Sequence, residues 1–407
     1  MYGIRIPQAQ RPRTADQAVR GQLGLFALLA LGLFLAFAPA ASADLNICTP
    51  GSAAGKCESP QGVAADNETG RLYVADSANN RIDVFESDGT FVIAFGWGVD
   101  TKAAELQTCT TASTCNTGTA GSGAGQFDKP QWVAVDNNPS SPSQHDVYVG
   151  TDNFHVQKFA PTGAFIEALG EKGKGPCQFE RTADPIAVGP EGNLYVADSY
   201  EDAPNHFVNR IVAFDATGKC LGGKEVDPLF AGQFETIRSF AVDSVANFYV
   251  TVAGAGGVVR KYSPSGTLLY QLGGTTKDGE AEGIAVDSAD RLFVKQNGAQ
   301  KTKPTVVSFI TEYDSAGAVF KRFNYIGLGD FPAASSLRIV PGLAADSTLS
   351  GDLYAARQAT GVEYLSLPQG PAVVPEPCRV KAGGLGNTKA TLLGEVNPNG
   401  KASTFHF

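Results

Sequence analysis

Short apolar runs separated by polar turns fill residues 44–370, and the same arrangement of runs occurs six times. The first copy reads PQGVAAD (60–66), RLYVAD (71–76), RIDVF (81–85) and DGTFVIAFG (88–96). The runs are rich in β-branched and aromatic residues, the turns are rich in Gly, Asp, Asn and Ser, and no helical period occurs. The sequence therefore predicts an all-β fold. Because four strands per copy are typical of propeller blades, we expect a six-bladed β-propeller over residues 44–370.

The later copies keep this order of strands, with local losses. Their first strands are expected at 130–136, 184–189, 239–243, 282–287 and 341–346. The sixth copy lacks an outer strand, because Pro368 and Pro371 follow its third strand directly. An open ring would leave unpaired strand edges, which folded proteins avoid. We therefore expect the segment Asp44–Cys48 to complete the last blade and to close the ring.

Residues 1–43 have the features of a secretory signal peptide. Four Arg and one Asp precede the apolar run Leu23–Phe37, and small residues follow at Ala41 and Ala43. An uncleaved membrane anchor is the alternative, but the run is shorter than the roughly 20 residues that a spanning helix needs. We expect cleavage before Asp44, no transmembrane span afterwards, and a secreted or cell-surface protein.

Composition and charge limit the classes of partner. The chain has a net charge of -9, and removal of the basic leader makes it more negative. Binding to nucleic acid needs clustered Lys and Arg, so we expect no nucleic-acid partner. The 47 Gly and 23 Pro, with only 18% charged residues, argue against a helical bundle, and 43% hydrophobic residues are enough to bury a core.

The cysteines predict disulfide bonds rather than a metal site. Disulfides are stable in exported proteins, and no Cys pair has the spacing of a zinc finger. We therefore expect no metal and no cofactor, with one cysteine, Cys378, left over. The pairs expected from proximity in sequence are Cys48–Cys57, Cys109–Cys115 and Cys177–Cys220.

One position in each first strand is a candidate for ligand binding. It lies five residues before the closing Asp or its equivalent, and the first strand of a blade borders the central channel. A mixture of acids, a base and amides near the channel mouth suits a polar ligand, although a solvated rim has the same composition. Trp132 lies beside these positions, where it would anchor a ligand or pack between blades. This first-strand ring consists of Gln61, Gln131, Asp184, Arg238, Glu282 and Pro341.

The closing aspartates allow two interpretations. They could form a ring of carboxylates around a cation, but each ends a strand and opens a turn, where Asp commonly accepts backbone N–H groups. The sequence favours turn capping. The aspartates are Asp66, Asp136, Asp243, Asp287 and Asp346. The four histidines, at 145, 155, 206 and 406, fall in separate parts of the chain, and we do not expect three of them to meet at one metal.

Two stretches resemble NHL repeats, namely DSANNRIDVF (76–85) and GAGQFDKPQWVAVD (123–136). Asp198 and Arg210 match Asp76 and Arg81 of the first copy, whereas the last three copies have lost both residues, and the second has His155 where the family usually has Arg. The resemblance is to secreted bacterial NHL-repeat proteins. It implies a six-bladed propeller that binds protein, glycan or nucleic acid on one face, and it implies that only a minority of relatives are enzymes.

Residues 371–407 differ from the repeats. The run ATLLGEVNPNGKASTFHF (390–407) resembles the opening strands of a fibronectin type III-like or immunoglobulin-like module. Such a sandwich needs about 100 residues, so we expect an incomplete module here.

The sequence predicts a non-catalytic binding scaffold for an extracellular protein or glycan. The expected binding surfaces are the long insertion at Gly98–Gly125 and the first-strand ring. The alternative is a hydrolase or lyase that holds a cation at the channel mouth with Asp184 and Glu282. No nucleophile elbow or phosphate-binding loop supports a specific enzyme class. We also expect Arg81 and Arg210 to hold blades together through hydrogen bonds to neighbouring carbonyls.

Overall fold

The computed structural model describes residues 45–365 with gaps. The gaps are positions 112, 152, 288 and 318 and the stretches 181–184, 204–205, 222–236, 253–257, 274–279, 300–305, 315–316, 325–342, 347–351 and 358–360. The expected signal peptide, the expected C-terminal module and Cys378 therefore lie outside the described residues. The chain divides into units of residues 1–45 and 46–407, and every strand except the first residue of β1 lies in the second unit.

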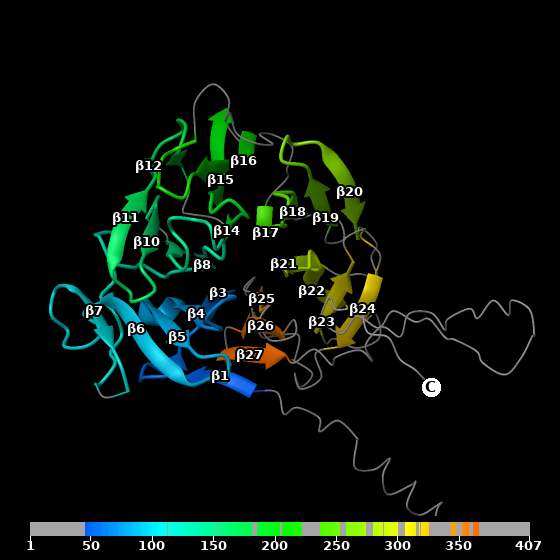
Figure 1. Ribbon diagram of the computed structural model, residues 1–407. Helices are drawn as coiled ribbons and strands as arrows, with labels where there is room; N and C mark the ends of the chain where they lie inside the picture. The colour runs from blue at the N-terminus through cyan, green and yellow to red at the C-terminus, as the bar shows by residue number, and fades with distance from the viewer. Residues whose placement is uncertain are drawn as a thin grey trace, which may run out of the picture. The chain divides into compact units, whose positions relative to one another are not determined.

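The structure is built of antiparallel sheets that follow one another along the chain (Figure 1). Blade 1 contains β3 (Pro60–Ala65), β4 (Leu72–Asp76), β5 (Arg81–Phe85), β6 (Phe91–Trp97) and β7 (Leu106–Cys109), with a 3-10 turn, η1 (Ser77–Asn79), after β4. Blade 2 contains β8 (Trp132–Val135), β9 (Val147–Gly150), β10 (Val156–Phe159) and β11 (Phe165–Leu169). Blade 3 contains β14 (Ile186–Val188), β15 (Leu194–Ala203) and β16 (His206–Phe214), preceded by a parallel ribbon of β12 (Glu171–Lys172) and β13 (Gln178–Phe179).

The second half of the chain repeats the arrangement. Blade 4 contains β17 (Ile237–Val242), β18 (Phe248–Val252), β19 (Val258–Tyr262) and β20 (Leu268–Leu272). Blade 5 contains β21 (Glu280–Val286), β22 (Leu292–Ala299), β23 (Val306–Tyr313) and β24 (Val319–Asn324). The closing blade contains β25 (Leu343–Asp346), β26 (Asp352–Arg357) and β27 (Gly361–Leu365), together with β1 (Leu45–Pro50) and β2 (Lys56–Cys57) from the other end of the chain.

The first strands of these sheets surround the centre of a β-propeller (Figure 1). β3 contacts β8, β8 contacts β14, and the contacts continue through β17, β21 and β25 back to β3. Five sheets have at least four strands, as full blades do, but blade 3 has only three described strands. Five blades therefore have the four or more strands that the sequence predicted, and the prediction of six such blades is not met. The segment expected as the outer strand of blade 3, residues 216–223, has three Gly among eight residues, which disfavours a strand, and it contributes one bridge, Phe214 to Cys220.

The two ends of the propeller meet in the closing blade. β1 lies beside β27 in the strand order β2-β1-β27-β26-β25, which confirms that the N-terminal strand supplies the outer strand of the last repeat. The Cys48–Cys57 disulfide joins β1 to β2, and the Cys109–Cys115 and Cys177–Cys220 pairs are also present. Covering the outer edge of β27 in this way removes a strand edge that would otherwise be open to pairing with another chain.

The apolar core lies mainly between neighbouring blades rather than inside them. In the cluster between blades 1 and 2, the Phe95 and Phe127 rings lie 5.2 Å and 5.4 Å from the Phe159 ring. The first strands also approach closely, because a Cβ on Gly62 would lie 2.7 Å from the carbonyl oxygen of Gln131. Only glycine permits this approach of β3 to β8.

This contact makes Gly62 a sensitive position for stability. We expect Gly62→Ala to lower the free energy of unfolding by about 2 kcal/mol, because the added methyl group must push two backbones apart. At Gly70 a Cβ has room, with its nearest neighbour at 3.8 Å, and the cost comes only from a φ of +73°. Gly70→Ala should therefore cost about 1 kcal/mol. Denaturant unfolding of the two variants checks the order, and equal losses would contradict a special role for the β3–β8 contact.

Candidate functional site

Residues of the first-strand ring occupy β-bulges at the start of their strands. In β17 the pairing passes from Ile237–Val252 to Ser239–Thr251, so Arg238 is the extra residue. In β21 it passes from Ala281–Gln296 to Gly283–Lys295, so Glu282 is the extra residue, and in β3 the irregularity lies between Pro60 and Val63, around Gln61. A bulge takes a side chain out of the regular alternation of a strand and is common beside binding sites. The same register irregularity therefore places residues from three blades in equivalent positions.

The structure brings part of this ring together. Gln61 and Gln131 lie on touching strands, next to the close approach at Gly62, and both are half-buried. Trp132 is also half-buried, and it packs against the apolar cluster between blades 2 and 3, as the packing interpretation expects. The Arg238 side chain is exposed. Gln61, Gln131 and Arg238 are thus the ring members whose side chains the structure describes, and Trp132 lies beside them.

The acidic pair expected for a hydrolase or lyase is not described as a pair. Asp184 and Pro341 lie outside the described residues. Glu282 is placed by its strand position only. The described side chains of the ring, with Trp132 beside them, therefore offer amides, a guanidinium and an indole, a set suited to recognition of a polar ligand.

The closing aspartates cap their own turns. Asp66 Oδ1 accepts the Glu68 and Thr69 N–H groups at 3.0 and 3.2 Å. The same arrangement occurs at three further first strands, at Asp136, Asp243 and Asp287. Asp346 lies in β25, and its side chain is outside the described residues. The four described carboxylates are thus occupied by local hydrogen bonds, and turn capping is the correct interpretation for them.

A buried arginine links blade 1 to two long loops. Arg81 donates to the carbonyl oxygens of Ser52 (2.6 Å) and Ala53 (3.2 Å) in the loop between β1 and β2, and to that of Lys56 (2.7 Å) at the start of β2. It also donates to the carbonyl oxygen of Asn116, in the insertion, at 3.2 Å. Its side chain is fully buried. The expectation that Arg81 holds blades together through carbonyl oxygens is confirmed, because β2 belongs to the closing blade. The carbonyl partners of Arg210 lie instead in the ribbon that precedes its own blade.

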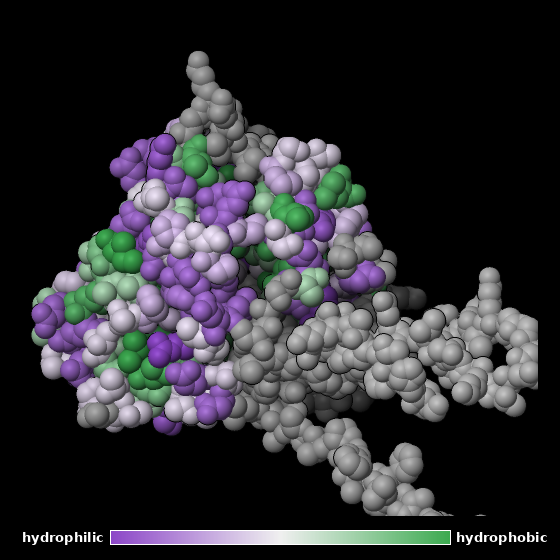
Figure 2. Space-filling model, in the orientation of Figure 1, coloured by the Kyte–Doolittle hydropathy of each residue, from purple (hydrophilic) through white to green (hydrophobic). Residues whose placement is uncertain are grey.

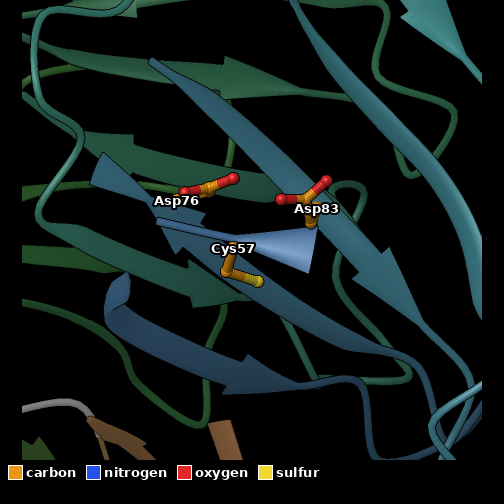
Figure 3. A group of neighbouring side chains, drawn as sticks. All are labelled: Cys57, Asp76 and Asp83. Atoms are coloured by element: carbon orange, nitrogen blue, oxygen red, sulfur yellow. The ribbon is translucent and has the colours of Figure 1, made fainter. Parts of the chain in front are cut away.

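Two buried carboxylates accompany this single guanidinium. Arg81 Nε lies 3.2 Å from Asp76 Oδ2 and 3.1 Å from Asp83 Oδ1, and all three side chains are inaccessible to solvent. Figure 3 shows Asp76 and Asp83 close together beside Cys57. Possible ligand atoms of these last three residues lie within 4.8 Å of one another. However, Cys57 is in a disulfide and Arg81 already supplies the positive charge, so the group does not fit a metal ion.

Burial makes this pair of carboxyl groups hard to ionise. It raises the pKa of Asp76 well above the ordinary value, and the nearby Asp83 carboxylate raises it further. Burial also raises the pKa of Asp83, although the Arg81 charge opposes this. Asp83 Oδ1 accepts no hydrogen bond, which adds to the cost of the ionised form.

Blade 3 contains a similar buried arginine with a single described carboxylate partner. In blade 3, Arg210 pairs with Asp198 at 2.8 Å and donates to the carbonyl oxygens of Lys174 and Gln178. At the position of Asp83, blade 3 has the apolar Val212. Of these two blades, only blade 1 therefore buries a second carboxyl group beside its arginine.

In blade 2 the side chain that binds the adjoining loop is Gln157, which the repeat pattern alone did not single out. His155 occupies the position of Arg81 in this blade. Burial lowers the pKa of His155, so the side chain favours its neutral form. Gln157, two residues later, accepts the Gly125 N–H at 2.7 Å and donates to the Gln126 carbonyl at 2.5 Å. Its equivalence to Asp83 in the repeat is the signal that could have identified it.

The insertion Gly98–Gly125 is firmly attached to blade 1. Part of it forms β7, the fifth strand of the sheet, and the Cys109–Cys115 disulfide closes its tip. Backbone N–H groups of Asn116 and Gly118 donate to the Val99 and Asn79 carbonyls at 2.7 Å each. The insertion thus reaches the end of blade 1 where β4 ends and β3 begins, the end that also carries Gln61.

Comparison with known proteins agrees with this repeat architecture. Residues 58–85 match the NHL repeat. NHL repeat-containing protein 3 of Mus musculus is 24% identical over 199 residues, which are 47% of this chain and 48% of the mouse protein. The match to this NHL-containing relative thus spans about half the length of the mouse protein.

Solved structures of low sequence identity resemble the chain as well. A gluconolactonase of Xanthomonas campestris is 12% identical, with a TM-score of 0.49, over 80% of this chain and 89% of that chain. Streptogramin B lyase is also 12% identical, with a TM-score of 0.43, over 80% of this chain and 97% of that chain. Identities this low carry no activity over to the NHL-containing chain.

The paired carboxyl groups predict an unusual pH dependence of stability. Because the pKa values of Asp76 and Asp83 are raised in the folded state, the folded chain holds protons that the unfolded chain loses near pH 4. The unfolding free energy contributed by this pair therefore falls as the pH rises through the raised pKa values. We expect Asp83→Asn to remove much of this fall. The slopes of unfolding free energy against pH should differ between the wild type and the variant by at most about 1.4 kcal/mol per pH unit for each proton.

Unfolding midpoints between pH 4 and pH 8 measure this difference. Asp88→Asn is the control, because hydrogen bonds from Thr90 lower the pKa of Asp88 and its contribution is lost on acidification instead. A profile for Asp83→Asn that is parallel to that of the wild type would show that the pair is ionised throughout.

Proposed function

We propose that the protein is a secreted, non-catalytic binding scaffold that recognises an extracellular protein or glycan through the insertion at residues 98–125. The observation that carries the proposal is that the insertion is held rigidly while its threonine side chains face solvent. Exposed threonines of this segment are Thr101, Thr108, Thr110, Thr111, Thr114, Thr117 and Thr119.

Rigidity favours recognition because an ordered loop loses little conformational entropy on binding. The insertion has a disulfide at its tip, a strand in the blade 1 sheet and hydrogen bonds to Arg81 and to the η1 turn. It also has few charges: Asp100, Lys102 and Glu105 are the ionisable residues between 98 and 125. A hydroxyl-rich and nearly uncharged surface suits hydrogen bonding to the hydroxyl groups of a glycan or to the backbone of a protein.

The surface of the described blades is compatible with a polar contact. Figure 2 shows small apolar patches separated by polar residues on the face in view. The described large apolar side chains that are exposed are spread over three blades, with only the neighbours Leu268 and Leu269 sharing a strand, and they are Ile166, Val245, Leu268, Leu269 and Val319. No described patch thus offers a broad apolar interface in place of the insertion.

Export is the second part of the proposal. Three disulfides among the described cysteines support an oxidising compartment, as does the apolar leader of residues 1–43. Within the described ranges, no helix is long and apolar enough to cross a membrane. The six-fold closure of the ring belongs to the same proposal, and the contacts of the six first strands in a closed circle support it.

Charge substitution on the insertion tests the binding role without removing the loop. We expect Thr111→Lys with Thr114→Lys to reduce capture of extracellular partners at least tenfold in a pull-down from cell-surface extract and on a glycan array. Thr90→Lys with Thr267→Lys is the matched control, because it adds the same charge at exposed threonines of two other hairpin turns. Partner profiles that are the same for both double variants would exclude the insertion as the binding surface.

A further inference from the structure

The loops of blades 1 and 2 meet at a histidine on the opposite end of the sheets from the insertion. Asp66 and Glu68 belong to the β3–β4 turn, and Gln144 and His145 belong to the β8–β9 loop. His145 Nδ1 lies 2.9 Å from Asp66 Oδ2, and His145 Nε2 lies 3.5 Å from Glu68 Oε2. Two residues far apart in sequence thus bring a ring nitrogen and a carboxylate oxygen to one place.

The buried Asp66 sets the orientation of this imidazole. One carboxylate oxygen caps the β3–β4 turn and the other contacts Nδ1, and the Asp66 side chain is only 1% exposed. The imidazole is 25% exposed, and its second nitrogen faces Glu68, which is 68% exposed. A carboxylate that holds one nitrogen of a histidine while the other faces outward is the usual arrangement behind a metal-binding histidine.

A third polar group lies at the same point. The Gln144 side-chain amide contacts the same Glu68 oxygen that faces His145. Rotation of this amide by half a turn presents its oxygen, which is a metal ligand, in place of its nitrogen. The two loops are held in position by Asn137, which accepts the Asn67 N–H at 2.7 Å and donates to the Ala65 carbonyl at 3.0 Å.

We propose that His145, Glu68 and Gln144 form a surface site for a divalent transition-metal ion such as Zn²⁺, which joins blade 1 to blade 2. Two ligand atoms bound to zinc at 2.0–2.1 Å in tetrahedral geometry are about 3.3 Å apart, close to the 3.5 Å between Nε2 and Oε2. Imidazole nitrogen with carboxylate oxygen is a donor set that zinc accepts. The site needs only one histidine, so it does not require the distant histidines of the chain to converge.

The competing explanation is a plain ion pair between a protonated His145 and the two carboxylates. Zinc titration separates the two explanations, because an ion pair holds no metal. The experiment uses the untagged chain, freed of metal with a chelator, and follows zinc chloride binding by calorimetry. We expect one zinc ion per chain with micromolar affinity, and a higher unfolding temperature in the presence of zinc, because the metal binds only the folded chain.

Three variants locate the site. His145→Gln and Glu68→Gln should each weaken zinc binding at least tenfold and abolish the shift in unfolding temperature. Glu191→Gln is the matched control, because Glu191 is an exposed carboxylate at the corresponding turn of blade 3, where it accepts a hydrogen bond from the Asn193 side chain. This variant should bind zinc as the wild type does.

Two results would overturn the proposal. One is an absence of zinc binding to the wild-type chain at millimolar zinc. The other is equal zinc affinity in the wild type and in both His145→Gln and Glu68→Gln. Lower stability of these two variants without any effect of zinc would identify an ion pair only. Each outcome is independent of whether the insertion binds a partner.

Discussion

One buried guanidinium joins blade 1 to two loops that lie 25–35 residues away along the chain. Arg81 lies in a strand of blade 1, yet its donors satisfy carbonyls of the loop after β1 and of the insertion. A buried arginine is costly unless all its donors are used. The two loops supply carbonyl acceptors, and the Asp76 and Asp83 carboxyl groups lie against Nε of the guanidinium. The position of the N-terminal strand and that of the exposed insertion therefore depend on the same side chain.

This arrangement explains why blade 1 is more elaborate than the others. Blade 3 keeps the arginine and one aspartate but anchors only its own ribbon of β12 and β13. Blade 1 adds a second carboxyl group, a fifth strand and two disulfides that hold the adjoining loops. These extra bonds and the extra strand hold the loops beside blade 1 in a fixed shape, as a binding site requires.

The two ends of the blades carry different chemistry. The end where first strands begin carries amides, Arg238 and the hydroxyl-rich insertion. The end where first strands finish carries capped turns, with the half-buried imidazole of His145 among them. The aspartates that recur in the sequence accept backbone N–H groups of these turns. A carboxylate that recurs in five of the six copies thus serves the repeat, whereas a residue that occurs in one copy, such as His145 or Asp83, marks what is particular to that blade.

Local patterns in the sequence determined the strands, the capped turns, the three disulfide pairs and the strand that closes the ring, because each follows from neighbours along the chain or from the need to cover an edge. Residues such as Gln61 and Gln131 could be selected as equivalent positions, but not placed side by side. Their proximity depends on the approach of two backbones at Gly62. The burial of Asp83 beside Arg81, the replacement of an arginine by Gln157 and the meeting of Glu68 with His145 were decided only by the tertiary structure. These contacts join residues of different loops or blades, and their geometry is set by how the sheets pack, which no local spacing encodes.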